Sequence, residues 1–248
     1  MPYPRSLIDD LAARAGADGA GRLLDLACGT GQLSFALHGC FGEVWAADQE
    51  PDMADTVRAK AKAAGIGNIR VLTSAAENLA APEQSFDLIA IGNAFHRLHR
   101  ETIAAIVFRR LRPGRCAALV WSDSPWVGEA PWQRALSAVK QRWMARTGAG
   151  DRVPPGYDLA RRERPDLGIL RDTGFGIVGR YEFLTAHEWT PDTLLGFMLS
   201  TSVLSHAALG ERVAGFGADL RRELTACEPA CRMRQTIRFA YDLARRPG

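Results

Sequence analysis

The chain has 248 residues, of which 47% are hydrophobic and 24% are charged, and its formal net charge is +3. This composition is that of an ordinary folded protein and excludes a long disordered chain, and so weak a positive charge does not require a nucleic-acid partner. No apolar run approaches the roughly 20 residues that cross a bilayer, and the N-terminal residues lack the apolar core of a signal peptide. We therefore expect a cytoplasmic protein without a membrane partner.

Five cysteines at irregular spacings argue against a framework of disulfide bonds. Cys227 and Cys231 form a C-x3-C pair, but no second pair or histidine cluster completes a zinc site. We expect ordinary thiols and no bound metal.

The first half of the chain alternates short apolar strands with helices. Predicted helices cover residues 4–15, 31–38, 52–64 and 100–111, the last of them stopped by Pro113-Gly114. Predicted strands cover residues 22–27, 43–48, 69–72, 86–92 and 115–121. Because these strands are apolar throughout, the pattern is typical of a parallel sheet with helices on both faces.

The pattern changes after residue 123. The sequence predicts a helix over 129–146, a polar loop over 147–164, a helix over 166–173, a strand over 176–185, helical structure over 190–226 and a strand over 233–242. The residues His187 to Trp189 are interpreted as a loop-to-helix junction anchored by the tryptophan.

The expected fold class is α/β, with a Rossmann-like, seven-stranded, mostly parallel sheet and helices on both faces. We expect a single domain whose core comprises residues 1–123, 165–188 and 229–248. Insertions at about 124–164 and 189–228 are expected to form a helical cap.

The residues Asp25-Leu26-Ala27-Cys28-Gly29-Thr30-Gly31 form a turn between the first strand and the helix that follows it. The two glycines allow positive φ values and a close approach of a ligand to the backbone, and the start of the helix offers N–H groups that suit a carboxylate or a phosphate. The nearest alternative, the dinucleotide fingerprint G-x-G-x-x-G, has a third glycine where this chain has Ser34. That difference, together with the acid inside the strand, favours a turn for S-adenosylmethionine (SAM) over a pyrophosphate turn.

Asp48 ends the second predicted strand, 17 residues after Gly31. Ligands of α/β sheets bind at the carboxyl ends of the strands, where a carboxylate can accept hydrogen bonds from both hydroxyls of a ribose. A helix N-cap is the alternative role for this acid. Its place one βαβ unit after the glycine turn favours ribose binding.

Several stretches of the chain resemble the class I SAM-dependent methyltransferases, in particular their small-molecule, type 11-like branch. The stretches are Leu-Leu-Asp-Leu-Ala-Cys-Gly-Thr-Gly (23–31), Ala-Asp-Gln-Glu-Pro-Asp-Met (47–53), Ala-Glu-Asn-Leu (76–79), Ser-Phe-Asp-Leu-Ile (85–89) and Leu-Arg-Pro-Gly (111–114). The resemblance spans residues 3 to about 122 and implies SAM as the cofactor.

In that family the glycine turn holds the methionine part of SAM, the acid after the second strand holds the ribose, and the loop after the third strand holds the adenine. The cofactor-binding residues that the resemblance and this sheet edge imply are Asp25, Ala27, Cys28, Gly29, Gly31, Asp48, Gln49, Met53, Ala76, Glu77, Asn93 and Ala94. The chain departs from the family at Ala75, where relatives often carry an acid for the adenine amino group. It also begins almost at the pair Tyr3-Pro4, before which related proteins often carry a segment that folds over SAM.

Methyl transfer requires the acceptor atom and the methyl group to be aligned in a dry pocket, and a base where the acceptor loses a proton. His96, just after the fourth strand, is the predicted catalytic base, with a capping histidine or a pocket wall as the alternative. We expect His99, Trp121 and Asp123 to contact the acceptor.

The expected function is methyl transfer from SAM to a nitrogen or oxygen atom of a small molecule, such as a natural-product or amino-sugar metabolite. The enzyme would act as a monomer or homodimer. A SAM-binding regulatory protein without catalysis is the main alternative, since a fold does not settle a function. An NAD-dependent oxidoreductase is a less favoured one.

Overall fold

The computed structural model describes residues 1–148, 163–201 and 203–248, so the loop predicted over 147–164 lies almost entirely outside the described residues. The chain divides into two compact units. The sheet unit comprises residues 2–121, 163–183 and 239–248. The helical unit comprises residue 1 with residues 122–148, 184–201 and 203–238.

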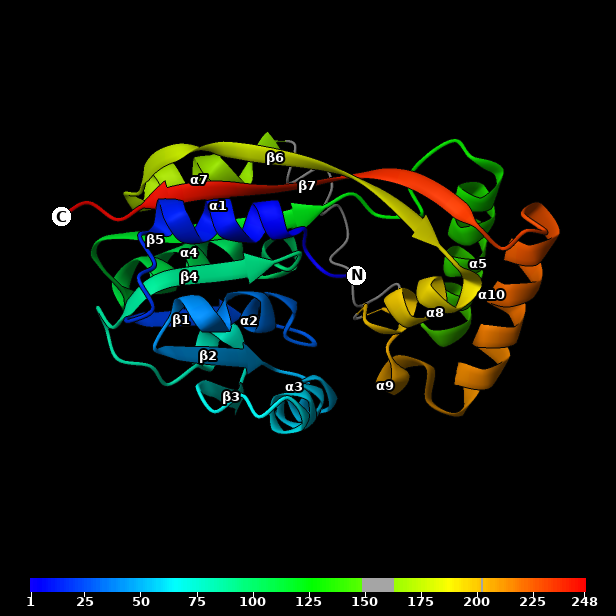
Figure 1. Cartoon of the computed structure of the whole chain (residues 1–248), viewed down its shortest axis with the longest axis horizontal. Helices are drawn as coiled ribbons and strands as arrows, with labels where there is room; N and C mark the ends of the chain where they lie inside the picture. Colours follow the sequence, from blue (N-terminus) through cyan, green and yellow to red (C-terminus); the bar gives the residue numbers. More distant parts are fainter. Residues whose placement is uncertain (149–162, 202) are drawn as a thin grey trace. The chain divides into compact units, whose positions relative to one another are not determined.

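Seven strands form one sheet in the order β3-β2-β1-β4-β5-β7-β6 (Figure 1). Their bounds are β1 (Arg22–Leu26), β2 (Glu43–Asp48), β3 (Ile69–Thr73), β4 (Phe86–Gly92), β5 (Leu111–Ser122), β6 (Gly176–Trp189) and β7 (Met233–Arg245). The strands β1 to β5 pair in parallel, so that Leu24 of β1 lies between Trp45 of β2 and Ile89 of β4. This arrangement brings the carboxyl ends of β1, β2 and β4 to the same edge of the sheet.

Strand β7 runs opposite to the others (Figure 1). The N–H of Gly114, near the start of β5, donates to the carbonyl of Arg246, which directly follows the end of β7. The start of one strand therefore pairs with the end of the other, as in an antiparallel ladder. The predicted α/β fold with a seven-stranded, mostly parallel sheet is confirmed.

Helices and short 3-10 turns connect the strands. Their bounds are α1 (Arg5–Ala15), α2 (Gln32–Leu37), η1 (His38–Cys40), α3 (Pro51–Ala63), η2 (Ala76–Asn78), η3 (Phe95–Arg97), α4 (Arg100–Arg110), α5 (Pro131–Thr147), α7 (Asp166–Thr173), α8 (Pro191–Leu199), α9 (His206–Leu209), η5 (Gly210–Arg212) and α10 (Val213–Cys227). The helices predicted over 4–15, 52–64 and 166–173 are confirmed to within one residue at each end.

The interpretation of His187 to Trp189 as a loop-to-helix junction is wrong. These three residues are the end of β6, and helix α8 begins only at Pro191. Exposure alternates residue by residue along β6, as expected of a strand at the edge of a sheet with one face covered. The sequence did not show that alternation at the end of β6, because charged and aromatic residues follow one another there.

Strand β5 begins four residues earlier than predicted. Helix α4 ends at Arg110, and the next residue, Leu111, already pairs with Phe86 of β4. The pairing then shifts, and Cys116 pairs with Leu88. Pro113 and Gly114 therefore lie within an irregular start of β5 rather than in a loop before it.

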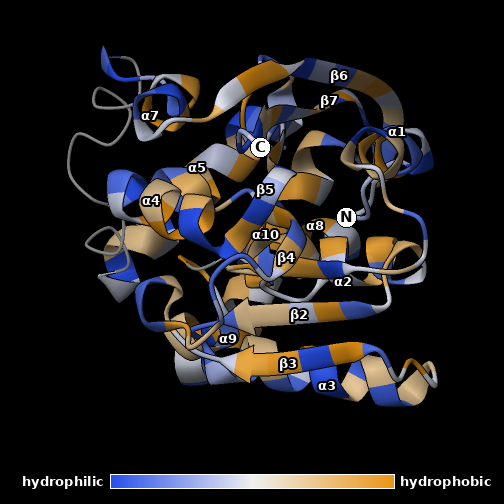
Figure 2. Ribbon diagram, turned by 90° about the vertical axis from the view of Figure 1, so that its left-hand side faces the viewer, coloured by the Kyte–Doolittle hydropathy of each residue, from blue (hydrophilic) through white to orange (hydrophobic). Residues whose placement is uncertain are grey.

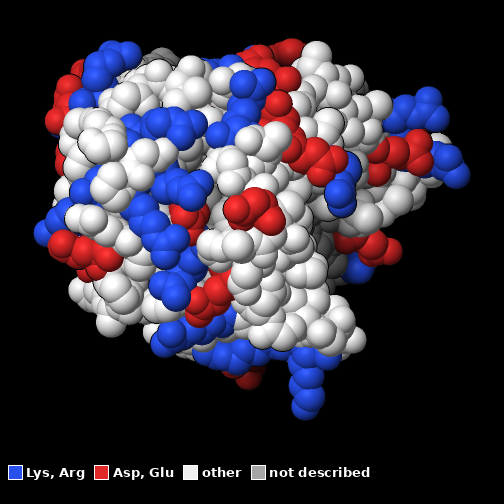
Figure 3. Space-filling view, turned by 60° about the vertical axis from the view of Figure 1, so that its left-hand side comes forward, with Lys and Arg blue, Asp and Glu red and all other residues white. Residues whose placement is uncertain are grey.

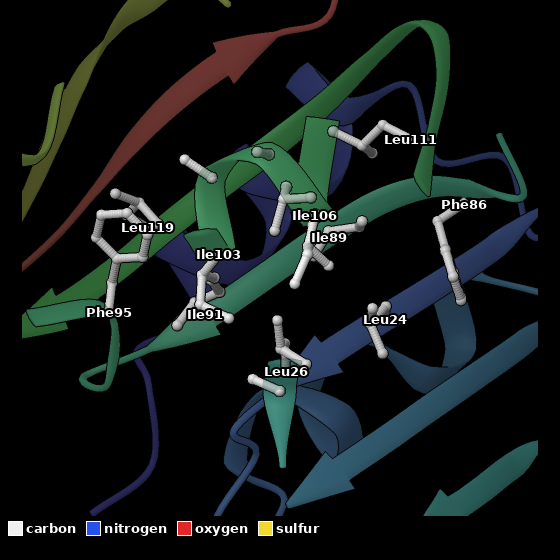
Figure 4. Close-up of a cluster of buried hydrophobic side chains, with 14 of the residues drawn as sticks. Leu24, Leu26, Phe86, Ile89, Ile91, Phe95, Ile103, Ile106, Leu111 and Leu119 are labelled. Carbon is white, nitrogen blue, oxygen red and sulfur yellow. The ribbon is translucent and has the colours of Figure 1, made fainter. Parts of the chain in front are cut away.

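The side chains of β1 alternate between two layers of the sheet unit, as a strand requires. Leu24 and Leu26 belong to a buried cluster with residues of β4 and with Ile103 and Ile106 of α4 (Figure 4). The carboxylate of Asp25, between them, is buried on the other face of the strand. Helix α3 shows alternating hydrophobic and hydrophilic bands (Figure 2) and buries Ala54, Val57 and Ala61.

The charged surface is mixed in sign. On the face that Figure 3 displays, Asp and Glu side chains lie among the Lys and Arg side chains. In the sheet unit, Arg112 and Arg115 approach the buried carboxylate of Asp87 at 2.8 and 3.1 Å. Within the described part of the chain, we find no helix of the length and apolarity that a membrane crossing demands.

Candidate active site

The turn after β1 carries an unusual run of left-handed backbone conformations. The φ angles are 56° at Ala27, 54° at Gly29 and 80° at Gly31. The Cys28 N–H donates to the carbonyl of Ala47 in β2 at 3.0 Å, which ties the turn to the neighbouring strand. A left-handed alanine is strained, and such strain gathers at functional sites.

The two glycines of the turn are needed for different reasons. Among the described residues, a Cβ on Gly29 would meet no atom within 4 Å, so the backbone there borders open space. A Cβ on Gly31 would lie 3.0 Å from Cε2 of Phe35 and 3.1 Å from Cγ2 of Val57. Gly29 therefore leaves room for a ligand, whereas Gly31 leaves room for the side chains of Phe35 and Val57.

We expect the Gly31→Ala variant to lose about 1–3 kcal/mol of unfolding free energy, because the added methyl overpacks a filled space. Gly29→Ala is the matched control, since both glycines have positive φ but only Gly31 is crowded. Urea denaturation without ligand measures both variants. Equal losses in the two variants would show that backbone strain, and not packing, is the reason for Gly31.

The carboxylate of Asp48 joins the turn to the start of α3. Its Oδ2 accepts the N–H of Gly29 at 2.7 Å, and its Oδ1 accepts the N–H of Glu50 at 3.0 Å. A carboxylate has about four acceptor positions, so two of them are left over by these contacts with the described residues. The side chain is buried but retains 8% exposure beside the open space at Gly29.

Asp25 has a different role from the one that the sequence predicts. Its Oδ2 accepts both the backbone N–H and the hydroxyl of Ser34, at 2.9 and 2.6 Å, and the residue is only 1% exposed. Asp25 thus holds the first turn of α2 from inside the protein. In this geometry the Asp25 carboxylate does not face a cofactor. Asp25 instead contributes to the shape of the turn.

Burial raises the pKa of Asp25 to about 6 from 3.8, the hydrogen bonds of Ser34 oppose this shift, and the Asp48 charge adds to it. The folded chain therefore holds the Asp25 proton more tightly than the unfolded chain does. The contribution of this proton to the unfolding free energy is complete below about pH 4 and is lost as the pH rises through about 6.

We expect the unfolding free energy of the wild type to fall by up to about 3 kcal/mol over that interval, relative to the Asp25→Asn variant, which has no proton to lose. Urea denaturation at a series of pH values measures the difference. Parallel pH profiles for the two proteins would contradict the raised pKa.

The Cys28 thiol lies inside the same turn. Burial and the charges of Asp25 and Asp48 raise its pKa, so the thiol stays protonated and is not a nucleophile. Its backbone, rather than its sulfur, is the part that a ligand could meet.

The remaining predicted cofactor residues lie in the loops after β2, β3 and β4. Gln49 is exposed and Met53, in the first turn of α3, is partly exposed. Ala76 and Glu77 form the 3-10 turn η2, where Ala76 is buried in the core cluster and Glu77 is partly exposed. Ala94 is the N-cap residue directly before η3.

The turn after β4 carries the predicted base. Asn93 has a φ of 52°, and its N–H donates to the carbonyl of Val120 in β5 at 2.8 Å. His96 follows in η3 and is partly buried. His99 stands at the N-cap position of α4 but makes no capping hydrogen bond with its side chain among the described residues.

The two other predicted acceptor contacts lie in different units. Trp121 is in the sheet unit, where the guanidinium of Arg180 lies 5.4 Å from the centre of its ring. Asp123 is in the helical unit, where its Oδ2 accepts the backbone N–H of Arg238 at 3.3 Å.

Two contributors were missed by the sequence analysis, Ser34 and Tyr3. Ser34 occupies the place of the third glycine in the dinucleotide fingerprint, and the sequence pattern distinguishes it only by that difference. Tyr3 accepts a hydrogen bond from the side-chain amide of Asn93 at 3.3 Å. The Tyr3-Pro4 pair was the sequence signal that could have identified Tyr3. No local pattern, however, shows which strand end the Tyr3 side chain contacts.

The residues of this edge fit SAM. The space at Gly29 is a cradle that a Cβ would fill, and it lies beside a carboxylate with acceptor positions left for ribose hydroxyls. Two acids, Asp25 and Asp48, stand behind the turn, which suits a ligand with a cationic centre better than a pyrophosphate.

Comparisons with known proteins point to methyltransferases. Residues 23–114 match the family model described as a methyltransferase domain. An uncharacterized methyltransferase of Mycobacterium tuberculosis (strain ATCC 25618 / H37Rv) is 33% identical over 228 residues, which cover 92% of this chain and 81% of the relative.

Two solved structures share the fold. A proposed type II methyltransferase from Anaeromyxobacter dehalogenans matches with a TM-score of 0.61 at 20% identity, over 99% of this chain and 97% of that one. A geranyl diphosphate methyltransferase in complex with SAM matches with a TM-score of 0.55 at 14% identity, over 98% and 85% of the two chains. With the family model and the 33% identical relative, the glycine turn and Asp48 lead to one conclusion: the chain belongs to the class I SAM-dependent methyltransferases.

Proposed function

We propose that the protein binds SAM at the carboxyl edge of β1, β2 and β4 and transfers its methyl group to a nitrogen or oxygen atom of a small molecule. The observation that carries the proposal is the open space at Gly29, which lies next to a carboxylate that still has acceptor positions. When bound, SAM supplies an electrophilic methyl group on a sulfonium sulfur.

The chain's own residues would bind and orient the two reactants. The turn around Gly29 would hold the methionine part, Asp48 the ribose, and the loop with Ala76 and Glu77 the adenine. With Ala75 in place of the family's acid, the backbone of that loop or the carboxylate of Glu77 would serve the adenine amino group.

His96 is proposed as the base. It lies in η3 directly after β4, at the same edge of the sheet as the glycine turn, and it is only partly buried. An imidazole can accept the proton that a hydroxyl or ammonium acceptor loses, which contributes about 10²–10⁴-fold in rate where such a base is used. A base of this kind serves a nitrogen or oxygen acceptor that must lose a proton.

Calorimetry tests the cofactor. We expect saturable binding of SAM and of its demethylated product, S-adenosylhomocysteine (SAH), and none of NADH. Saturable NADH binding without SAM binding would replace the proposal with an oxidoreductase. SAM binding without SAH formation from any of a panel of hydroxyl and amine acceptors would favour the regulatory alternative.

A further inference from the structure

The turn after β4 is closely packed. Asn93 adopts a left-handed conformation, with a φ of 52°, which asparagine tolerates better than most residues but which is uncommon outside glycine. Gly92, just before it, has no room for a side chain, because a Cβ there would lie 2.9 Å from the Tyr3 hydroxyl and 3.0 Å from Cδ1 of Leu33. The Tyr3 hydroxyl therefore rests directly over the end of β4.

Tyr3 is itself held at two points. Its ring packs edge-on against Phe239 of β7, with the ring centres 5.9 Å apart. Its hydroxyl oxygen accepts the side-chain amide of Asn93 at 3.3 Å. The aromatic contact fixes the ring, so the hydroxyl offers a fixed acceptor to the side-chain amide of Asn93.

The Tyr3 phenol stays in its neutral form. Burial and the nearby charge of Asp25 raise the pKa of Tyr3, an effect that the Asn93 hydrogen bond reduces but does not cancel. Tyr3 therefore accepts the Asn93 amide as a neutral hydroxyl throughout the physiological pH range.

Backbone hydrogen bonds within the turn link Asn93 to His96. The N–H of Arg97 donates to the carbonyl of Ala94 at 2.8 Å, and the N–H of Leu98 donates to that of Phe95 at 3.1 Å. His96 lies between these residues, only three positions after Asn93, so this short stretch of hydrogen-bonded backbone connects it to Asn93.

We infer that Tyr3 is a positioning residue of the methyltransferase site, whose hydroxyl fixes Asn93 and thereby the orientation of His96. The inference rests on the catalytic role of His96 under the proposed function. It assigns a role in the chemistry to a residue 93 positions away in the sequence.

NMR of the full chain with ¹³C-labelled histidine tests the inference without an acceptor substrate. In Tyr3→Phe we expect the His96 ring signal to shift while those of His38, His187 and His206 stay in place. We also expect the amide protons of Arg97 and Leu98 to exchange about fivefold faster, as loss of one hydrogen bond implies.

The control is Tyr181→Phe, which removes the same hydroxyl from a ring whose centre lies 5.1 Å from that of Tyr241 in β7. It is expected to leave the His96 signal and both amides unchanged. Asn93→Ala is expected to reproduce the effects of Tyr3→Phe, and the double variant to add nothing to Asn93→Ala, because residues that act through one contact are not additive.

An unchanged His96 signal in Tyr3→Phe would overturn the inference. So would effects of equal size in Tyr181→Phe, or additive effects in the double variant. Binding of SAH, measured by calorimetry on the same samples, distinguishes failure of the proposed function from failure of the inference about Tyr3. A wild type that does not bind SAH would remove the proposed function, whereas the coupling of Tyr3 to His96 would still be read from the NMR signals.

Discussion

The Gly29→Leu variant is expected to bind SAH at least about 100-fold more weakly than the wild type, a loss of about 2.7 kcal/mol. The new side chain would fill the open space at the glycine turn, where a Cβ has no neighbour within 4 Å among the described residues. Its stability in the absence of ligand is expected to fall only by the cost of a left-handed leucine, about 1–2 kcal/mol. Calorimetry with SAH and urea denaturation measure the two effects separately.

Gly65→Leu is the matched control for this experiment. Gly65 has a φ of 66°, close to the 54° of Gly29, and its Cβ would also meet no described atom within 4 Å. It lies between α3 and β3, at the opposite edge of the sheet from the glycine turn. The control is expected to bind SAH like the wild type, and equal weakening in both variants would show that the cradle is not the cofactor site.

Replacing His96 with alanine is expected to lower turnover by about 10²–10⁴-fold and to leave the SAH dissociation constant within about twofold of the wild type. The reason is that the imidazole is proposed to take a proton from the acceptor and not to hold the cofactor. Release of SAH, followed with any acceptor of the panel that gives measurable turnover, provides the rate.

Two further measurements separate a missing base from general damage. His38→Ala removes a histidine from η1, away from the carboxyl edge, and is expected to keep wild-type turnover. Added imidazole is expected to restore part of the turnover of His96→Ala, since a free base can enter the space of the lost side chain. Unchanged turnover in His96→Ala would remove this residue from the mechanism.

The order of elements could be read from the sequence because it depends on local signals. Apolar runs between glycine and proline turns predict β1, β2 and β4 to within a residue of their observed bounds. The parallel pairing of these strands follows from the alternation with helices. Since the carboxyl ends of such strands share one edge, the sequence alone predicts that Gly29 and Asp48 lie close together.

The partners of individual side chains were not predictable in the same way. A sequence shows that Asp25 lies in a buried strand, but not that Ser34 supplies both hydrogen bonds to its carboxylate. The contact between Tyr3 and Asn93 joins residues 90 positions apart, and only the packing of the N-terminal residues against the sheet creates it. Local patterns therefore locate the site, whereas tertiary contacts decide which of its residues can meet a ligand.

The hydrogen bonds of Asp48 also make ligand binding a property of the folded state alone. Its carboxylate is oriented by the backbone N–H groups of Gly29 and Glu50, and these three groups come together only when β1, β2 and α3 are assembled. A ligand held by this carboxylate therefore stabilises the native chain by mass action, by about 2.7 kcal/mol at a concentration 100 times its dissociation constant. Melting temperatures can therefore be used to search for the methyl acceptor: with SAH present at saturation, a compound that raises the melting temperature further binds the native chain together with SAH and becomes a candidate acceptor.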